Sequence, residues 1–309
     1  MKVILPLLAP LLVFFAAYAA QKSEQVVPSN PQAEIAYEEI RATFETIPTF
    51  MKEFPQEAIS GAWQEFRDIQ LNPTTALTPK TKELIGLAVA AQIPCVYCVY
   101  FHKRAATFNG ATPQELNYAI AVAADTRKWA THIEGSPLPF AKFKIDVDKM
   151  TGFLRNRKPT EVSEVKPAPL IGDGSAAYKD MEKTVGITPN FVKNYAAKGI
   201  AGAWNEHKLL SMNPKSPLAP ATIDLISLAV SAQTPCQNCV YLYSEFAKLH
   251  GATEEQLRET IAMAAVTRHW STFLNGLQQP QKDFEREVDQ IFKRMEDRKN
   301  QMNKQISSK

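Results

Sequence analysis

The sequence predicts an all-α protein built from two tandem copies of one helical domain. Three observations support this. A constant offset of 141 positions aligns one half of the chain with the other, Ala- and Leu-rich stretches with helix-capping residues recur in both halves, and no stretch alternates apolar and polar residues long enough for a strand. The composition, 45% hydrophobic and 22% charged, is that of a folded globular chain.

The duplication extends well beyond any single motif. The aligned pairs are "GAWQEFRDIQLNP" with "GAWNEHKLLSMNP", "ELIGLAVAAQIPC" with "DLISLAVSAQTPC", and "DTRKWATHIEG" with "VTRHWSTFLNG". The register needs no gap from Tyr37 and Tyr178 through Gly276. Chance does not produce such a match, so the repeating unit is a whole domain rather than a short solenoid repeat.

The domain boundaries follow from this alignment. The stretch 158–174 is rich in Pro, Gly and polar residues, which is typical of a linker. We therefore expect an N-terminal repeat over 21–157 and a C-terminal repeat over 175–309. Each repeat ends in a charged stretch of helical periodicity, at 140–157 and 281–304, which predicts a solvated amphipathic helix or an oligomer contact.

The first twenty residues differ from the rest of the chain. Lys2 precedes a long apolar run, and the small-x-small pattern at 17–19 is typical of a signal-peptide cleavage point. We expect a signal peptide over 1–20, cut after Ala19 or Ala20, and export, most simply to a bacterial periplasm. The alternatives are a secreted protein or an uncleaved membrane anchor, because the run approaches the length that spans a bilayer.

The first two helices of the expected site follow from capping signals. Thr78 is placed as an N-cap with Pro79 in the first turn, and the Ala/Leu-rich sequence that follows indicates a buried helix. Pro94 interrupts this helix, so a second one should begin at or just before Cys95 and end at a Gly110 cap. A third helix opens after Gly110 with the capping-box pattern "TPQE", and the C-terminal repeat has the same order.

The cysteines occur only as two C-x-x-C pairs, Cys95 with Cys98 and Cys236 with Cys239. Four cysteines are too few for a disulfide scaffold, and the C-x-x-C spacing is typical of redox chemistry. In an oxidising compartment we expect each pair to rest as a disulfide. The alternatives are purely structural disulfides, although so short a loop constrains the unfolded chain little, and a zinc site built from both pairs, which lie far apart in sequence.

The spacing of four residues in the N-terminal repeat predicts a proton relay. Cys95 and Cys98 should share one face at a helix N-terminus, where the partial positive charge stabilises a thiolate. His102 lies one turn beyond Cys98. If the preceding helix folds back antiparallel, Glu83 and His102 each stand roughly 14 Å from the turn, at ~1.5 Å per residue, and can meet. Carboxylate, imidazole and thiol would then act in series.

These four residues form the pattern E-x11-C-x2-C-x3-H, which resembles the motif of alkylhydroperoxidase D-like proteins in the carboxymuconolactone decarboxylase superfamily. The resemblance covers most of each repeat. It implies an all-helical fold, Cys98 as the sulfur that attacks a peroxide, Cys95 as the resolving sulfur that forms a disulfide with it, and Glu83 with His102 as the relay. It also implies a homo-oligomer, here a trimer of tandem repeats that imitates a hexamer.

The C-terminal repeat departs from this motif around Cys236 and Cys239. Asp224 replaces the glutamate and is one methylene shorter, and Tyr243 replaces the histidine. Tyrosine, with a pKa near 10, is a poor base at neutral pH. We therefore expect attenuated peroxidase chemistry there, or an auxiliary or structural redox pair. Three histidines have no histidine counterpart in the other repeat and are candidate replacements for the lost imidazole: His207, His250 and His269.

The sequence therefore favours a peroxiredoxin-like, thiol-dependent peroxidase that reduces hydrogen or organic peroxides, with an unidentified thiol reductant and without a cofactor or metal. The alternatives are an exported thiol–disulfide oxidoreductase, a non-redox decarboxylase-like protein and an oligomeric scaffold with locked disulfides. The net charge of +3, with both signs interspersed, argues against nucleic acid or a membrane surface as partner.

Overall fold

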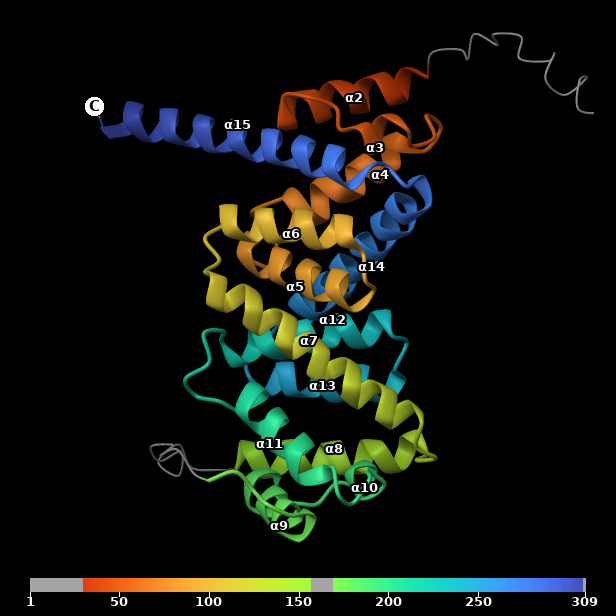
Figure 1. Ribbon diagram of the computed structural model, residues 1–309, viewed down its shortest axis with the longest axis vertical. Coiled ribbons are helices and arrows are strands. Elements are labelled where there is room, and N and C mark those ends of the chain that lie inside the picture. Colours follow the sequence, from red (N-terminus) through yellow and green to blue (C-terminus); the bar gives the residue numbers. More distant parts are fainter. Residues whose placement is uncertain (1–29, 157–168, 308–309) are drawn as a thin grey trace, which may run out of the picture.

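The computed structural model describes residues 30–156 and 169–307 (Figure 1). The expected signal peptide at 1–20, with its cleavage point, lies outside these residues, and so does most of the expected linker at 158–174. The described part of the chain is helical and has no strands, which confirms the all-α prediction. None of its helices is both long enough and apolar enough to cross a membrane.

The two repeats form corresponding series of helices. The N-terminal series is α2 (Pro31–Phe44), α3 (Thr49–Lys52), α4 (Ile59–Glu65), the π-helical turn η1 (Phe66–Leu71), α5 (Pro79–Gln92), α6 (Val96–Phe108), α7 (Pro113–Glu134) and α8 (Phe140–Arg155). The C-terminal series is α9 (Gly174–Val185), α10 (Asn190–Lys193), α11 (Ile200–Ser211), α12 (Pro220–Gln233), α13 (Gln237–Leu249), α14 (Glu254–Leu277) and α15 (Gln281–Ser307). From α3 and α10 onward, matching helices begin at the same offset as the sequences, so the duplication is structural as well.

The expected helix caps are present. The Thr78 hydroxyl accepts a hydrogen bond from the Thr81 backbone N–H at 3.2 Å. Both reciprocal bonds of the capping box between Thr112 and Glu115 form at the start of α7. Gly110 has a φ of +84° just after α6, a conformation that glycine adopts at little cost.

The repeats interlock rather than stand side by side. The long helix α7 of the first repeat packs against α12 and α11 of the second, and α14 of the second packs against α5, α6 and η1 of the first. Figure 1 shows the resulting elongated stack, with α14 beside α5 and α6 and with α7 crossing α12 and α13. One continuous hydrophobic core runs through both repeats, so each repeat completes the other.

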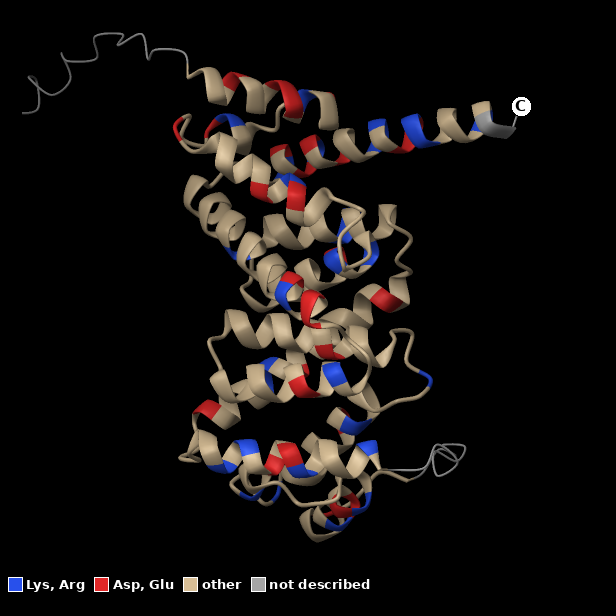
Figure 2. Ribbon diagram, turned by 180° about the vertical axis from the view of Figure 1, so that it is seen from behind, with Lys and Arg blue, Asp and Glu red and all other residues tan. Residues whose placement is uncertain are grey.

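The charged tails of the two repeats pack in the same crossed manner. Helix α8 lies on α13, and α15 lies on α6 and α2. Each tail buries an apolar face, which includes Phe143 and Val147 on α8 and Phe284 and Val288 on α15. Charges of both signs are interspersed along the two helices (Figure 2). The predicted amphipathic helices are thus present, and their apolar faces cover the other repeat of the same chain.

Candidate functional site

The cysteine pair of the first repeat lies at the N-terminus of α6. Cys95 is the N-cap, and its sulfur accepts a hydrogen bond from the Cys98 backbone N–H at 3.2 Å. The two sulfurs share a hydrogen bond at 2.6 Å and are thiols in this structure, so the expected disulfide between them stays a prediction. Cys95 is 0% exposed, whereas Cys98 is 4% exposed and lines a pocket. Access to a substrate therefore selects Cys98.

The close contact couples the ionisation of the two thiols. The hydrogen bond with Cys98 lowers the pKa of Cys95 to about 6 against the opposing effect of burial, with help from Ser271 and His102. The same contact and burial raise the pKa of Cys98. The pair therefore releases one proton near neutral pH and holds the second. Because the sulfurs are in contact, we treat the single negative charge as shared by both.

The predicted contact between carboxylate and imidazole is present. Glu83 Oε2 lies 2.7 Å from His102 Nδ1, and both side chains are buried. Glu83 Oε1 also accepts a hydrogen bond from Gln70 Nε2 at 3.1 Å. Because the carboxylate engages Nδ1, the ring presents Nε2 to the rest of the site, where the Thr267 hydroxyl lies 3.5 Å away.

A π-helical turn brings Gln70 to this carboxylate. The turn η1 occurs in the first repeat, whereas the corresponding part of the second repeat belongs to the regular helix α11. Such a turn shifts the direction in which the following side chains project, and it is frequent at functional sites. Gln70 was not among the predicted site residues, although the difference from its counterpart Ser211 was an available signal.

Gly86 makes room for the imidazole. A Cβ at this position would lie 2.3 Å from Cε1 of His102, so no larger residue fits while the ring is in place. The second repeat has Ser227 at the matching position, together with Tyr243 in place of the histidine. Gly86 was not among the predicted site residues either, and the available signal was that both positions, glycine and histidine, differ together between the repeats.

We expect Gly86→Ala to displace His102 from Glu83 and to slow any reaction that uses the relay, while the protein stays folded. The reason is the steric overlap between the new methyl group and the ring. The ¹⁵N chemical shifts of the His102 ring by NMR, compared between the variant and the unaltered protein, would detect the loss of the carboxylate contact. The matched variant Ser227→Ala, at the second site, should leave the His102 signal unchanged.

The second repeat supplies part of the first site. Ser271 and Thr267 are both on α14, and the Ser271 hydroxyl favours a lower pKa for both thiols of the cysteine pair. On α7, which faces the second site, the counterpart of Ser271 is Ala130 and the counterpart of Thr267 is Thr126. The hydroxyl beside the thiols is therefore confined to the first site. Sequence reasoning within one repeat could not find it, because it comes from the other.

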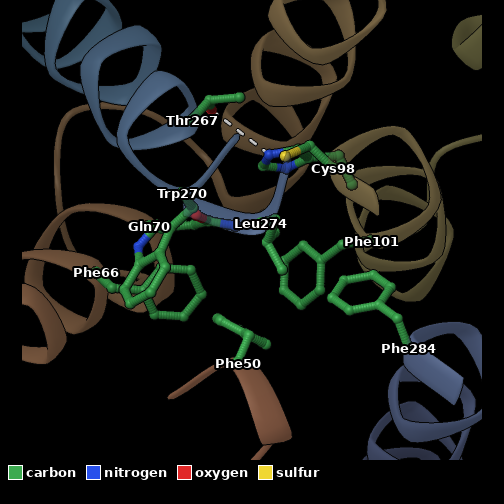
Figure 3. Close-up of a pocket in the computed structure, with 10 residues that line it drawn as sticks. Phe50, Phe66, Gln70, Cys98, Phe101, Thr267, Trp270, Leu274 and Phe284 are labelled. Atoms are coloured by element: carbon green, nitrogen blue, oxygen red, sulfur yellow. Dashed lines mark hydrogen bonds between the residues drawn. The ribbon is translucent and has the colours of Figure 1, made fainter. Parts of the chain in front are cut away.

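An apolar pocket leads to Cys98. Its volume is about 370 Å³, part of which is open to solvent. Figure 3 shows Cys98 and Thr267 at one end, with the rings of Phe50, Phe66 and Phe101 towards the other. Trp270, Leu274 and Phe284 complete the apolar wall. The pocket therefore admits a small, largely apolar molecule to one sulfur and one imidazole.

The second site is more enclosed. Cys236 and Cys239 form a disulfide, and both are 0% exposed. Tyr243 occupies the position of His102, and burial raises its pKa further above the neutral range. Asp224, whose pKa is also raised by burial, accepts a hydrogen bond from His250 Nδ1 at 2.5 Å.

The candidate replacement histidines do not restore the relay. His250 follows Cys239 by eleven residues, which at ~1.5 Å per residue is roughly 16 Å along the helix. His269 packs on Phe54 and Trp270 beside the first site. His207 pairs with Asp125 of the first repeat at 2.8 Å. Among the described residues, no group of three or more His, Cys, Asp or Glu side chains is arranged to hold a metal ion.

Comparison with known proteins agrees with this architecture. The pattern of the carboxymuconolactone decarboxylase family matches residues 58–134 and 199–282, which together cover more than half of the chain. A stretch of 57 residues is 40% identical to "Uncharacterized protein 4 in cox locus" from Paracoccus denitrificans, covering 18% of this chain and 51% of that protein. The chain thus spans about half the length of this curated relative. No solved structure matches the chain. The two family matches and the duplicated helical fold establish that the chain belongs to the carboxymuconolactone decarboxylase family, as a tandem-duplicated, alkylhydroperoxidase D-like member.

Proposed function

We propose that the protein is a thiol-dependent peroxidase that reduces organic hydroperoxides at Cys98. The observation that carries this proposal is the arrangement of one pocket-lining sulfur, a second sulfur in contact with it and a carboxylate-backed imidazole beside them. An activated nucleophile, a base and a group that orients the base are what nucleophilic catalysis requires.

Peroxide reduction proceeds in two steps, and a third step regenerates the two thiols. The Cys98 thiolate attacks the terminal oxygen of the hydroperoxide, the O–O bond breaks, and the alkoxide leaves as an alcohol with a proton from the relay. The Cys95 thiol then attacks the Cys98 sulfenic acid, which forms the disulfide and releases water. An external thiol reduces the disulfide by exchange and is itself oxidised.

The pocket favours a small hydroperoxide over a protein disulfide as substrate. Cys98 is 4% exposed and lies behind aromatic side chains, so the disulfide of a folded protein has no direct approach to it. The apolar wall offers burial to an alkyl or aryl group, which hydrogen peroxide lacks. We therefore propose organic hydroperoxides as the preferred class. If the protein were instead a thiol–disulfide oxidoreductase, it would react faster with disulfides than with organic hydroperoxides.

The remaining parts of the proposal concern the assembly and its location. The sequence of the first twenty residues supports export to a periplasm, and the family resemblance supports a homo-oligomer, with a trimer of tandem repeats as our proposal. At the second site, the enclosed sulfurs and the tyrosine in place of histidine support a structural or auxiliary disulfide rather than a second peroxidase site.

The test is peroxide consumption by the reduced protein. We expect one equivalent of cumene hydroperoxide to be consumed rapidly per chain. Cys98→Ser should abolish this reaction because it removes the attacking sulfur, whereas Cys239→Ser should leave it nearly unchanged. Cys95→Ser should still consume one equivalent but end as a sulfenic acid, which dimedone labels. Full activity in Cys98→Ser would exclude the proposed mechanism.

A further inference from the structure

The second site has a pocket of its own at the place that corresponds to the first. Its volume is about 500 Å³, part of which is open to solvent. Several of its wall residues are the counterparts of first-pocket residues at the constant offset, among them Phe191 for Phe50 and Trp129 for Trp270. The duplication has therefore preserved a pocket as well as a fold.

This pocket no longer leads to a sulfur. Cys98 lines the first pocket, but Cys239 is fully enclosed and is not among the residues that line the second. Tyr243 lines the pocket in the position that His102 has in the first. A molecule that enters the second pocket thus meets the tyrosine side chain rather than the disulfide.

Two replacements have introduced a carboxylate–imidazole pair whose imidazole lies in the wall of this pocket. His207 stands where the first pocket has Phe66, and Asp125 stands where α14 has Val266. The two residues come from different repeats, yet His207 Nδ1 lies 2.8 Å from Asp125 Oδ2. Burial raises the pKa of Asp125, but His207 and Lys128 outweigh it and keep the pKa below its usual value. A buried, ionised carboxylate therefore fixes the ring.

The fixed imidazole leaves its other nitrogen free. His207 lines the pocket, and no described residue forms a hydrogen bond with its Nε2. With Nδ1 held as a donor to the carboxylate, Nε2 of a neutral ring is a hydrogen-bond acceptor. An acceptor in a mostly apolar pocket is the kind of group that orients a ligand.

A donor without a partner lies beside this acceptor. The indole Nε1 of Trp129 is buried and has no hydrogen-bond partner among the described residues. The Trp129 ring lines the same pocket, with its centroid 6.0 Å from that of His207. A buried N–H without a partner costs free energy, so its retention calls for an explanation. A ligand hydroxyl that reached both groups would accept from the indole and donate to the imidazole.

We propose that the second pocket is a binding site for a small aromatic molecule with one hydroxyl group, of the phenol class. A hydroxyl is a single small group that can accept from the Trp129 donor and donate to the His207 acceptor. The walls suit an aromatic body, because Trp204 and Phe191 offer ring contacts and Met150, Met181 and Met212 offer adaptable thioethers. This proposal does not depend on the peroxidase activity of the first site.

The test compares two probes of the same shape by isothermal titration calorimetry on the full chain. We expect 4-propylphenol to bind roughly tenfold more tightly than 4-propyltoluene, whose methyl group replaces the hydroxyl, because two hydrogen bonds are gained. His207→Phe, which restores the residue of the first pocket, should reduce this preference to roughly threefold, because the Trp129 hydrogen bond remains, while the affinity for 4-propyltoluene stays the same.

A second variant distinguishes the loss of a hydrogen bond from a loss of the fold. Trp129→Phe removes only the donor and should reduce the preference by roughly threefold, since one hydrogen bond remains. Phe66→His, at the matching position of the first pocket, is the control and should leave the preference unchanged. Equal affinity for the two probes in the unaltered protein, or a preference that is undiminished in His207→Phe, would overturn the proposal.

Discussion

Replacing His102 with glutamine should slow peroxide reduction by about 10²–10⁴-fold, which is the range of a positioned acid–base group. Glutamine can still hydrogen-bond Glu83, so the change removes proton transfer with little loss of packing. The measurement is the single-turnover rate with cumene hydroperoxide, monitored by the loss of free thiols. Glu83→Gln should have a smaller effect in the same assay, because that residue orients the base and does not touch the substrate.

The pH profile separates this role from a merely structural one. In the unaltered protein we expect the rate to rise through about pH 6, where Cys95 and Cys98 release their first proton, and then to level off. His102 contributes to lowering this pKa through its charge, so the midpoint should move to higher pH in His102→Gln. Asp224→Asn, at the second site, is the matched control and should change neither rate nor midpoint. An unshifted profile together with an unchanged rate would contradict the relay.

Much of the first site follows from local rules. The caps at Thr78 and Thr112 and the interruption at Pro94 define three helices, and an antiparallel pair of helices brings Glu83 to the height of His102. All of these relations lie within a short stretch of one repeat. Short-range periodicity and capping chemistry are sufficient to predict them.

The crossing of the repeats does not follow from local rules. Helices α7 and α14 descend from one sequence, and each packs against both α5 and α12, one in its own repeat and one in the other. The contact within a repeat follows from the apolar face of each helix, but the contact across the repeats depends on packing over the whole chain. The sites therefore include residues from the opposite repeat, which no sequence pattern within one repeat predicts. These residues are Ser271, Thr267 and Asp125. The usable signal was a difference between matched positions, such as Ser271 against Ala130.

Lys82→Ile should lower the free energy of unfolding by about 3–5 kcal/mol, the range for breaking a buried ion pair. Lys82 is 0% exposed, and its Nζ lies 3.0 Å from Oε1 of Glu259 on α14. It also donates to the backbone oxygens of Ile69 and Asn72 at 2.6 and 2.7 Å. The substitution leaves the Glu259 carboxylate buried without its cation, and urea denaturation monitored by circular dichroism measures the cost.

The other half of the molecule provides the compensating change. At the matching positions the chain has Ile223 and Tyr118, and the Tyr118 hydroxyl donates to the Leu210 carbonyl at 2.7 Å. Leu210 is the counterpart of Ile69, so a neutral donor from the opposite repeat satisfies the carbonyl that corresponds to the one Lys82 satisfies.

The double variant Lys82→Ile with Glu259→Tyr should therefore regain most of the stability that the single variant loses. Because Lys82 also holds the end of η1, the single variant should weaken the Gln70–Glu83 contact and slow peroxide reduction, and the double variant should recover both properties. Recovery of neither would mean that the ion pair, rather than the satisfied carbonyl, holds α14 against the first site.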